Sequence, residues 1–271
     1  MKTIAQTLAA LLAGIFFLVA CSGDPETPPP PPAEEEEVVD IWKDYDAGNI
    51  RFENRAATTP GGRVTGAIAE KDPLFFDKIA RRVLAILYFS PEDSITKVRN
   101  LTIRLEDFDG VAYATSDNTG NIIAMSCRWI GSTFLDTRDT VKVADEIIGV
   151  LLHEMTHVYQ LEPRAPGGYG SNAEVWACIE GTADAVRYLA GSFAENDVGA
   201  GGSYMDGYRT TGFFLGWIQK TKDPDFLRLF NRAALHVQPW TFPAAFRYAL
   251  GDSADINALW VEYQAYRRTV N

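Results

Sequence analysis

Positively charged residues are scarce in this sequence of 271 residues. Its 25 lysines and arginines stand against 36 aspartates and glutamates, which gives a formal net charge of −11. Nucleic-acid binding depends on clustered lysine and arginine side chains that neutralise phosphates. The composition therefore argues against a nucleic acid as partner.

Cysteine and histidine are also rare, with three residues of each. One cysteine, Cys21, lies near the N-terminus. The other two, Cys127 and Cys178, are compatible with a disulfide or with two buried free thiols, and we favour the thiols. Of the histidines, His153 and His157 are four residues apart.

An apolar stretch at residues 8–19 follows Lys2 and is too short to span a bilayer with normal flanks. It ends just before Cys21, where cleavage is expected, and resembles the lipobox of bacterial lipoproteins. We therefore expect residues 1–20 to be a lipoprotein signal peptide and Cys21 to carry the lipid. An ordinary signal peptide with an incidental cysteine is the alternative.

Residues 21–40 contain five consecutive prolines and then four consecutive glutamates. Proline stiffens a chain toward polyproline II, and like charges extend it. We expect a disordered stalk that holds a folded domain, residues 41–271, away from a membrane. The expected location is extracytoplasmic, at the bacterial outer membrane or cell surface.

The rest of the chain predicts an α+β fold. Amphipathic periodicity predicts a helix over residues 73–89. Alternating segments bounded by turn-forming residues predict strands at 101–105, 111–114 and 122–130. Further helices are predicted at 141–161, 173–191, 205–221, 224–235 and 254–267. Strands followed by helices indicate a small β-sheet and then a mainly helical half.

The clearest chemical signal is the pentapeptide HEMTH at residues 153–157. His153 and His157 project from one face of a predicted helix, so both imidazoles can bind one zinc ion. Glu154 can take a proton from a water whose pKa zinc lowers. A chance match on a buried helix is the alternative, but imidazoles on so apolar a helix are costly without a partner.

A catalytic zinc site needs a third protein ligand and one open position. Glu180 and Asp184 share a face of the next predicted helix. Glu180 can complete a His, His, Glu set, and Asp184 can hydrogen-bond a ligand imidazole and fix its tautomer. Glu174 is the weaker candidate for the third ligand. Gly181 disfavours a helix interior, which suggests close packing against the helix that carries the histidines.

A peptidase also benefits from a group that stabilises the negative charge that develops on the substrate oxygen. Tyr208, or alternatively Tyr204, can supply a phenol, although ordinary packing explains either tyrosine equally well. The third histidine, His236, is expected to have a structural role.

The motifs together resemble the plant basic secretory protein family, which has bacterial members regarded as zinc peptidases. The resemblance rests on the segments at 149–160, 165–168 and 179–187, and it covers most of the chain from about residue 50. It implies a zincin-like fold, in which a strand borders the cleft over the metal helix.

The resemblance also implies His153 and His157 as zinc ligands and Glu154 as general base, while Glu180 is assigned from its spacing. We therefore expect a zinc metallopeptidase in which a zinc-activated water attacks the peptide bond. A non-catalytic zinc-containing binding or scaffold lipoprotein is one alternative, and a zinc amidase acting on cell-wall peptides is another.

The expected partners are a protein or peptide substrate and a membrane, reached through the lipid on Cys21. We expect the chain to be a monomer. The predicted strand at 122–130 is expected to pair with an extended substrate, because an edge strand offers free backbone groups.

Overall fold

A four-stranded sheet forms one side of the structure, a computed structural model that describes residues 40–270. The predicted signal peptide, the lipidated Cys21 and nearly all of the stalk lie outside the described residues. The described residues, 40–270, belong to one compact unit. No helix in the described part has the length and apolar character that crossing a bilayer requires.

The sheet is made of β1 (Asn49–Asn54), β2 (Asn100–Glu106), β3 (Ala112–Asp117) and β4 (Gly120–Ser126). Their spatial order is β1-β2-β4-β3. The first three in that order are parallel, and β3 is antiparallel to β4. Strand β4 is therefore interior, and β3 forms an edge of the sheet.

The prediction of a strand at 122–130 is wrong for residues 127–130, which are helical. The hydroxyl of Ser126 accepts a hydrogen bond from the backbone N–H of Trp129 and caps α3 (Cys127–Thr137). The apolar run misled the prediction, because strand and helix starts look alike over so few residues. The expectation that this strand pairs with substrate is also wrong, since β4 already has two neighbours.

Three helices pack close to the sheet: α1 (Pro60–Lys71), α2 (Phe75–Leu87) and α4 (Thr140–Tyr159). The ring of Phe76 on α2 lies 5.2 Å from that of Phe52 on β1. The side chain of Asp139 caps α4 by accepting from the N–H groups of Val141 and Lys142. Nearly all of the second half of α4 is buried.

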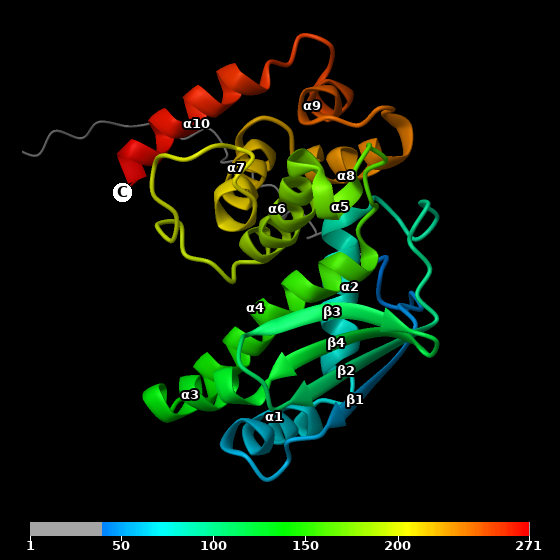
Figure 1. The fold of residues 1–271 in the computed structure, drawn as a ribbon, viewed down its shortest axis with the longest axis vertical. Helices are drawn as coiled ribbons and strands as arrows, with labels where there is room; N and C mark the ends of the chain where they lie inside the picture. Colours follow the sequence, from blue (N-terminus) through cyan, green and yellow to red (C-terminus); the bar gives the residue numbers. More distant parts are fainter. Residues whose placement is uncertain (1–39, 271) are drawn as a thin grey trace, which may run out of the picture. The chain divides into compact units, whose positions relative to one another are not determined.

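The helical half contains α5 (Gly168–Ser171), α6 (Ala173–Leu189), α7 (Tyr208–Thr221), α8 (Phe226–His236), α9 (Phe242–Leu250) and α10 (Ile256–Val270). Figure 1 shows the sheet on one side of α4 and the later helices on the other. The mixed α+β architecture with a small sheet and a mainly helical half is thus confirmed. Cys127 and Cys178 are buried free thiols, as favoured from the sequence.

Helices α6 and α7 meet along three glycines, which we call the glycine seam: Gly181, Gly212 and Gly216. A Cβ atom at Gly181 would lie 2.3 Å from the Thr211 side chain, and one at Gly212 would lie 2.8 Å from the backbone of Asp184. Such distances leave no room for a side chain. The expectation that Gly181 packs against the histidine helix is wrong, because it faces α7.

Candidate metal and catalytic site

Helix α4 presents both histidines of the HEMTH motif on one face. The Nε2 atoms of His153 and His157 lie 3.1 Å apart, and the two rings are nearly perpendicular. Their side chains are only 13% and 17% exposed. Two imidazole nitrogens this close and this buried favour a shared ligand between them.

Helix α6 supplies the third group. Oε2 of Glu180 lies 3.3 Å from Nε2 of His153 and 3.6 Å from Nε2 of His157. A tetrahedral zinc site with bonds of about 2.0–2.1 Å has ligand atoms about 3.3–3.4 Å apart. The three donor atoms match that spacing, so this group could hold a metal ion. Two nitrogens and one carboxylate oxygen suit zinc.

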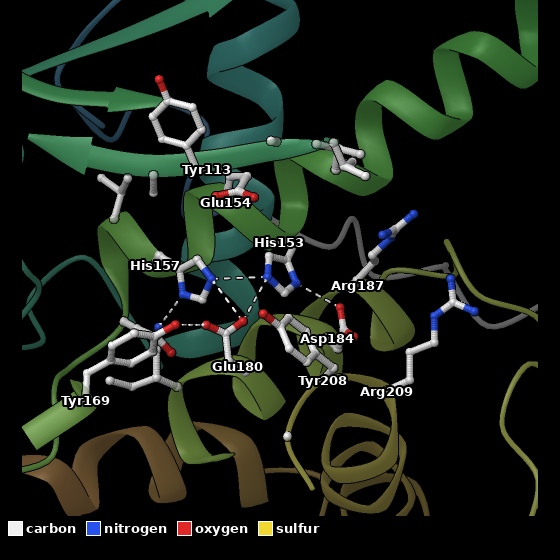
Figure 2. A pocket seen from close by; sticks show the side chains of 18 of the residues that line it. Tyr113, His153, Glu154, His157, Tyr169, Glu180, Asp184, Arg187, Tyr208 and Arg209 are labelled. Atoms are coloured by element: carbon white, nitrogen blue, oxygen red, sulfur yellow. Dashed lines mark hydrogen bonds and ion pairs between the residues drawn. The ribbon is translucent and has the colours of Figure 1, made fainter. Parts of the chain in front are cut away.

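Each histidine has a partner on its other ring nitrogen (Figure 2). Oδ1 of Asp184 lies 2.8 Å from Nδ1 of His153, as predicted from the spacing of α6. The amide of Gln160 lies 2.9 Å from Nδ1 of His157. Such partners orient metal-binding imidazoles. Gln160 was not predicted as a site residue, although it follows the motif within one helical turn.

The orientation of Glu180 depends on Tyr169, another residue that was not predicted from the sequence. The phenol of Tyr169 donates to Oε1 of Glu180 at 2.5 Å, which leaves Oε2 facing the histidines. The segment between α4 and α6, which carries Tyr169, turns back to the site at Gly167 and Gly168, both with positive φ. The glycine-rich segment around Tyr169 was the only sequence signal.

Glu154 is buried, with 7% of its surface exposed, and lines the same cleft as the histidines. Burial raises the pKa of Glu154 to about 7; the charge of Glu180 adds to this shift and that of His153 opposes it. A carboxyl group with a pKa near neutrality can both accept and return a proton.

The two histidines differ in protonation in the metal-free protein. Burial lowers the pKa of His157 to about 4, and the charge of His153 adds to that shift. Burial also acts to lower the pKa of His153, but hydrogen bonds with Asp184 and Glu180 outweigh it and raise the pKa to about 9. Near neutral pH the pair therefore carries one positive charge, on His153.

Tyr208 lies at the start of α7, with its ring stacked on that of His153 at 6.0 Å between centroids. Its backbone is left-handed, with φ of 40°, directly after Gly207. Burial and the charge of Glu180 raise the pKa of its phenol. The phenol therefore stays protonated and can donate a hydrogen bond within the cleft.

The alternative candidates lie elsewhere. Tyr204 packs against Phe242 and Trp260. Oε2 of Glu174 accepts a hydrogen bond from the backbone N–H of Phe242, so Glu174 does not reach the histidines. His236 stacks on Tyr248, away from this cleft.

The cleft has a volume of about 1130 Å³ and is bordered by β3, α4, α6 and the start of α7. One wall is the edge strand, with Ala112, Tyr113 and Ala114. Figure 2 shows Glu180 and Tyr208 across the site from Tyr113. The candidate metal group therefore faces an open groove that an extended chain can enter.

A family model described as a peptidase of plants and bacteria matches residues 47–263, which is most of the chain. No curated protein and no solved structure matches this chain.

Proposed function

Because the chain belongs to the basic secretory protein family of plant and bacterial peptidases, as its motifs indicated, we propose that it is a zinc-dependent peptidase. The observation that carries the proposal is the triangle formed by Nε2 of His153, Nε2 of His157 and Oε2 of Glu180. It lies in an open cleft beside a buried carboxyl group, that of Glu154.

In this proposal His153, His157 and Glu180 hold the zinc ion. When bound, the metal supplies a Lewis acid that lowers the pKa of a water and polarises the substrate carbonyl. Glu154 accepts the proton of the attacking water and passes it to the leaving amine. The phenol of Tyr208 donates a hydrogen bond to the negative charge that develops on the carbonyl oxygen.

The substrate in this proposal is an extended peptide that pairs with β3 and not with β4. Strand β3 has one neighbour in the sheet, and its free side borders the cleft. Unpaired backbone groups of an edge strand can bind an extended chain by strand addition. A sheet edge alongside a helix with HExxH also supports the zincin-like fold that the family resemblance implies.

Metal analysis and peptide hydrolysis of three variants test the proposal. Glu154→Gln is expected to keep one zinc ion per chain and to lose hydrolysis by about 10²- to 10⁴-fold, the usual effect of losing a general base. His157→Ala and Glu180→Ala are expected to lose zinc. Glu262→Gln, an exposed substitution on α10, is the matched control.

If Glu154→Gln hydrolyses peptides at the wild-type rate, the proposed enzymatic function is contradicted. A scaffold protein with a structural metal is then favoured. Full zinc occupancy in Glu180→Ala removes Glu180 as third ligand. Casein and peptidoglycan fragments, assayed side by side, separate a peptidase from an amidase that uses the same residues.

We further propose that the chain is an extracytoplasmic lipoprotein anchored through Cys21, a proposal supported by the leader sequence alone. Labelled palmitate is expected to enter the wild type in a bacterial host and not Cys21→Ser. Equal labelling of both chains would contradict the anchor.

A further inference from the structure

Two arginines line one end of the cleft. Arg187 comes from α6 and Arg209 from α7. Figure 2 shows both on the Asp184 side of His153, opposite Tyr169. Their guanidinium carbons lie 4.4 Å and 4.6 Å from the centroid of the Phe193 ring, so one aromatic ring holds both cations.

Few direct contacts with carboxylates hold the two guanidinium groups at this end. Arg187 reaches Glu146 only at 3.5 Å, and its buried Nε has no hydrogen-bond partner within the described residues. Arg209 is exposed and takes part in none of the ion pairs found among residues 40–270. Asp206 also lines the cleft, but its Oδ2 accepts from the backbone of Ser203.

Two neighbouring cations disfavour each other unless an anion joins them. Burial lowers the pKa of Arg187; the charges of Glu146, Asp184 and Asp197 oppose that shift, and the charge of Arg209 adds to it. A guanidinium group binds a carboxylate through two parallel hydrogen bonds.

The direction of β3 indicates which part of a substrate reaches this end. Val111, directly before β3, shares a small apolar hollow with Glu146 and Val150, and Glu146 contacts Arg187. Strand β3 therefore begins at the arginine end. Figure 1 shows that it then runs alongside α4 toward the end of that helix.

Antiparallel pairing is the more frequent and slightly more stable form of strand addition. A peptide antiparallel to β3 enters with its N-terminal part near Tyr169. Its residues on the C-terminal side of the scissile bond then lie toward Arg187 and Arg209.

We propose that Arg187 and Arg209 form a carboxylate-binding subsite that selects peptides with a negative charge on the C-terminal side of the scissile bond. The carboxylate belongs to an aspartate or glutamate side chain, or to a free chain end. This inference rests on the proposed peptidase function.

The first experiment digests a library of peptides with the zinc-loaded wild type and maps the cleavage sites by mass spectrometry. Carboxylates are expected to be enriched within a few residues downstream of the cut. The best sequence is then made in three forms: with glutamate and an amidated end, with glutamine and an amidated end, and with glutamine and a free end.

The second experiment measures kcat/KM for these peptides with the wild type, Arg209→Gln and Arg268→Gln. The wild type is expected to prefer a carboxylate form over the all-amide form by about 10- to 100-fold, the range for one charge-assisted hydrogen bond. Arg209→Gln is expected to lose this preference, so that its kcat/KM values for the carboxylate forms fall toward its value for the all-amide peptide. Arg268, exposed on α10, is the matched control and keeps it.

Comparison of kcat/KM for the two carboxylate forms shows whether the subsite binds a side-chain carboxylate or the carboxylate of a free chain end. Equal kcat/KM for all three peptides in wild type and Arg209→Gln overturns the subsite and leaves the peptidase standing. Arg187→Lys keeps the positive charge but loses the paired N–H donors of the guanidinium group. It is expected to weaken the preference for a carboxylate without removing it.

A binding measurement separates failure of the subsite from failure of the peptidase function. Fluorescently labelled forms of the peptides are titrated onto Glu154→Gln and onto the double variant Glu154→Gln, Arg209→Gln. Tighter binding of a carboxylate form by the first variant alone supports the subsite even if the wild type hydrolyses nothing. Equal binding by both variants overturns it.

Discussion

Asp184 supports the site from behind His153. Its Oδ1 lies 2.8 Å from Nδ1 of that imidazole, which leaves Nε2 free for a metal. We expect Asp184→Asn to weaken zinc binding by about 10- to 100-fold, because the partner of the ligand loses its charge. Competition with a chelator measures the affinity. Asp206→Asn, in the same cleft but bonded to Ser203, is the control. Equal affinities in all three proteins would contradict this role.

Protonation of His153 couples metal binding to pH. Its pKa is about 9 in the metal-free protein, so a metal that binds at pH 7 to 8 must displace about one proton. We expect the affinity to rise with pH up to about 9. Calorimetry in buffers of different ionisation enthalpy measures the proton released, and Asp184→Asn is expected to release less. Binding enthalpies that are independent of the buffer would contradict the coupling.

The same group affects the stability of the metal-free protein. Because folding raises the pKa of His153 above its ordinary 6.5, its contribution to the free energy of unfolding is fully present below about pH 6.5. The contribution is lost as the pH rises toward about 9. Urea denaturation across this range is expected to show the loss in the wild type and a flatter profile in Asp184→Asn.

Single residues of the site differ in how far the sequence reveals them. His153, His157, Glu180 and Asp184 follow spacings of four within two helices, and the structure places them together as that periodicity implies. Tyr169 reaches Glu180 only because a loop with positive φ angles closes back over the cleft. Such loop closure leaves no periodic signal.

Among the elements, the glycine seam between α6 and α7 fixes the position of the cleft wall. We expect Gly212→Ala to lower the free energy of unfolding by about 1–3 kcal/mol, because its Cβ would lie 2.8 Å from the backbone of Asp184. Chemical denaturation measures the change. Gly199→Ala, where a Cβ meets nothing within 4 Å, is the control and is expected to change little. Equal free energies of unfolding for Gly212→Ala and the wild type would show that α6 and α7 can move apart at little cost.

Elements with strong periodicity were predicted to within a few residues, including α2, α4, α6 and β2. Others were missed. Helix α1 begins Pro60-Gly61-Gly62, a composition that disfavours helix. It forms because Thr59 caps it and because its glycines fit where a side chain cannot, as at Gly61, whose Cβ would lie 2.1 Å from the carbonyl oxygen of Cys127. Tertiary packing of this kind overrides local preference.

At the scale of the whole molecule, the candidate ligands join two halves of the fold. The histidines lie on α4 beside the sheet, and Glu180 comes from the helical half. Metal at about 100 times its Kd adds about 2.7 kcal/mol to stability. We therefore expect chelation to lower the Tm by about 5–10 °C. Thermal denaturation of His157→Ala, which should not respond to a chelator, is the control, and equal responses would contradict metal-linked stability.

The architecture as a whole was predictable in class but not in detail. Alternating and helical periodicities indicated a small sheet and a helical half, because each reports only which face of an element is buried. The order of strands depends on contacts between distant segments, such as β1 with β2, that no local pattern encodes. This is why the edge strand at the cleft was assigned to the wrong segment.

The glycine seam would also shape the outcome of a saturation mutagenesis screen. Scored by activity alone, substitutions at Gly181, Gly212 and Gly216 would rank with those at Glu154, although no glycine contributes a functional group. Scored by cellular abundance as well, the two classes separate: seam variants lose the protein, and Glu154 variants keep it. Sequence drift in this protein is thus constrained as tightly by positions that must stay empty as by positions that must carry charge.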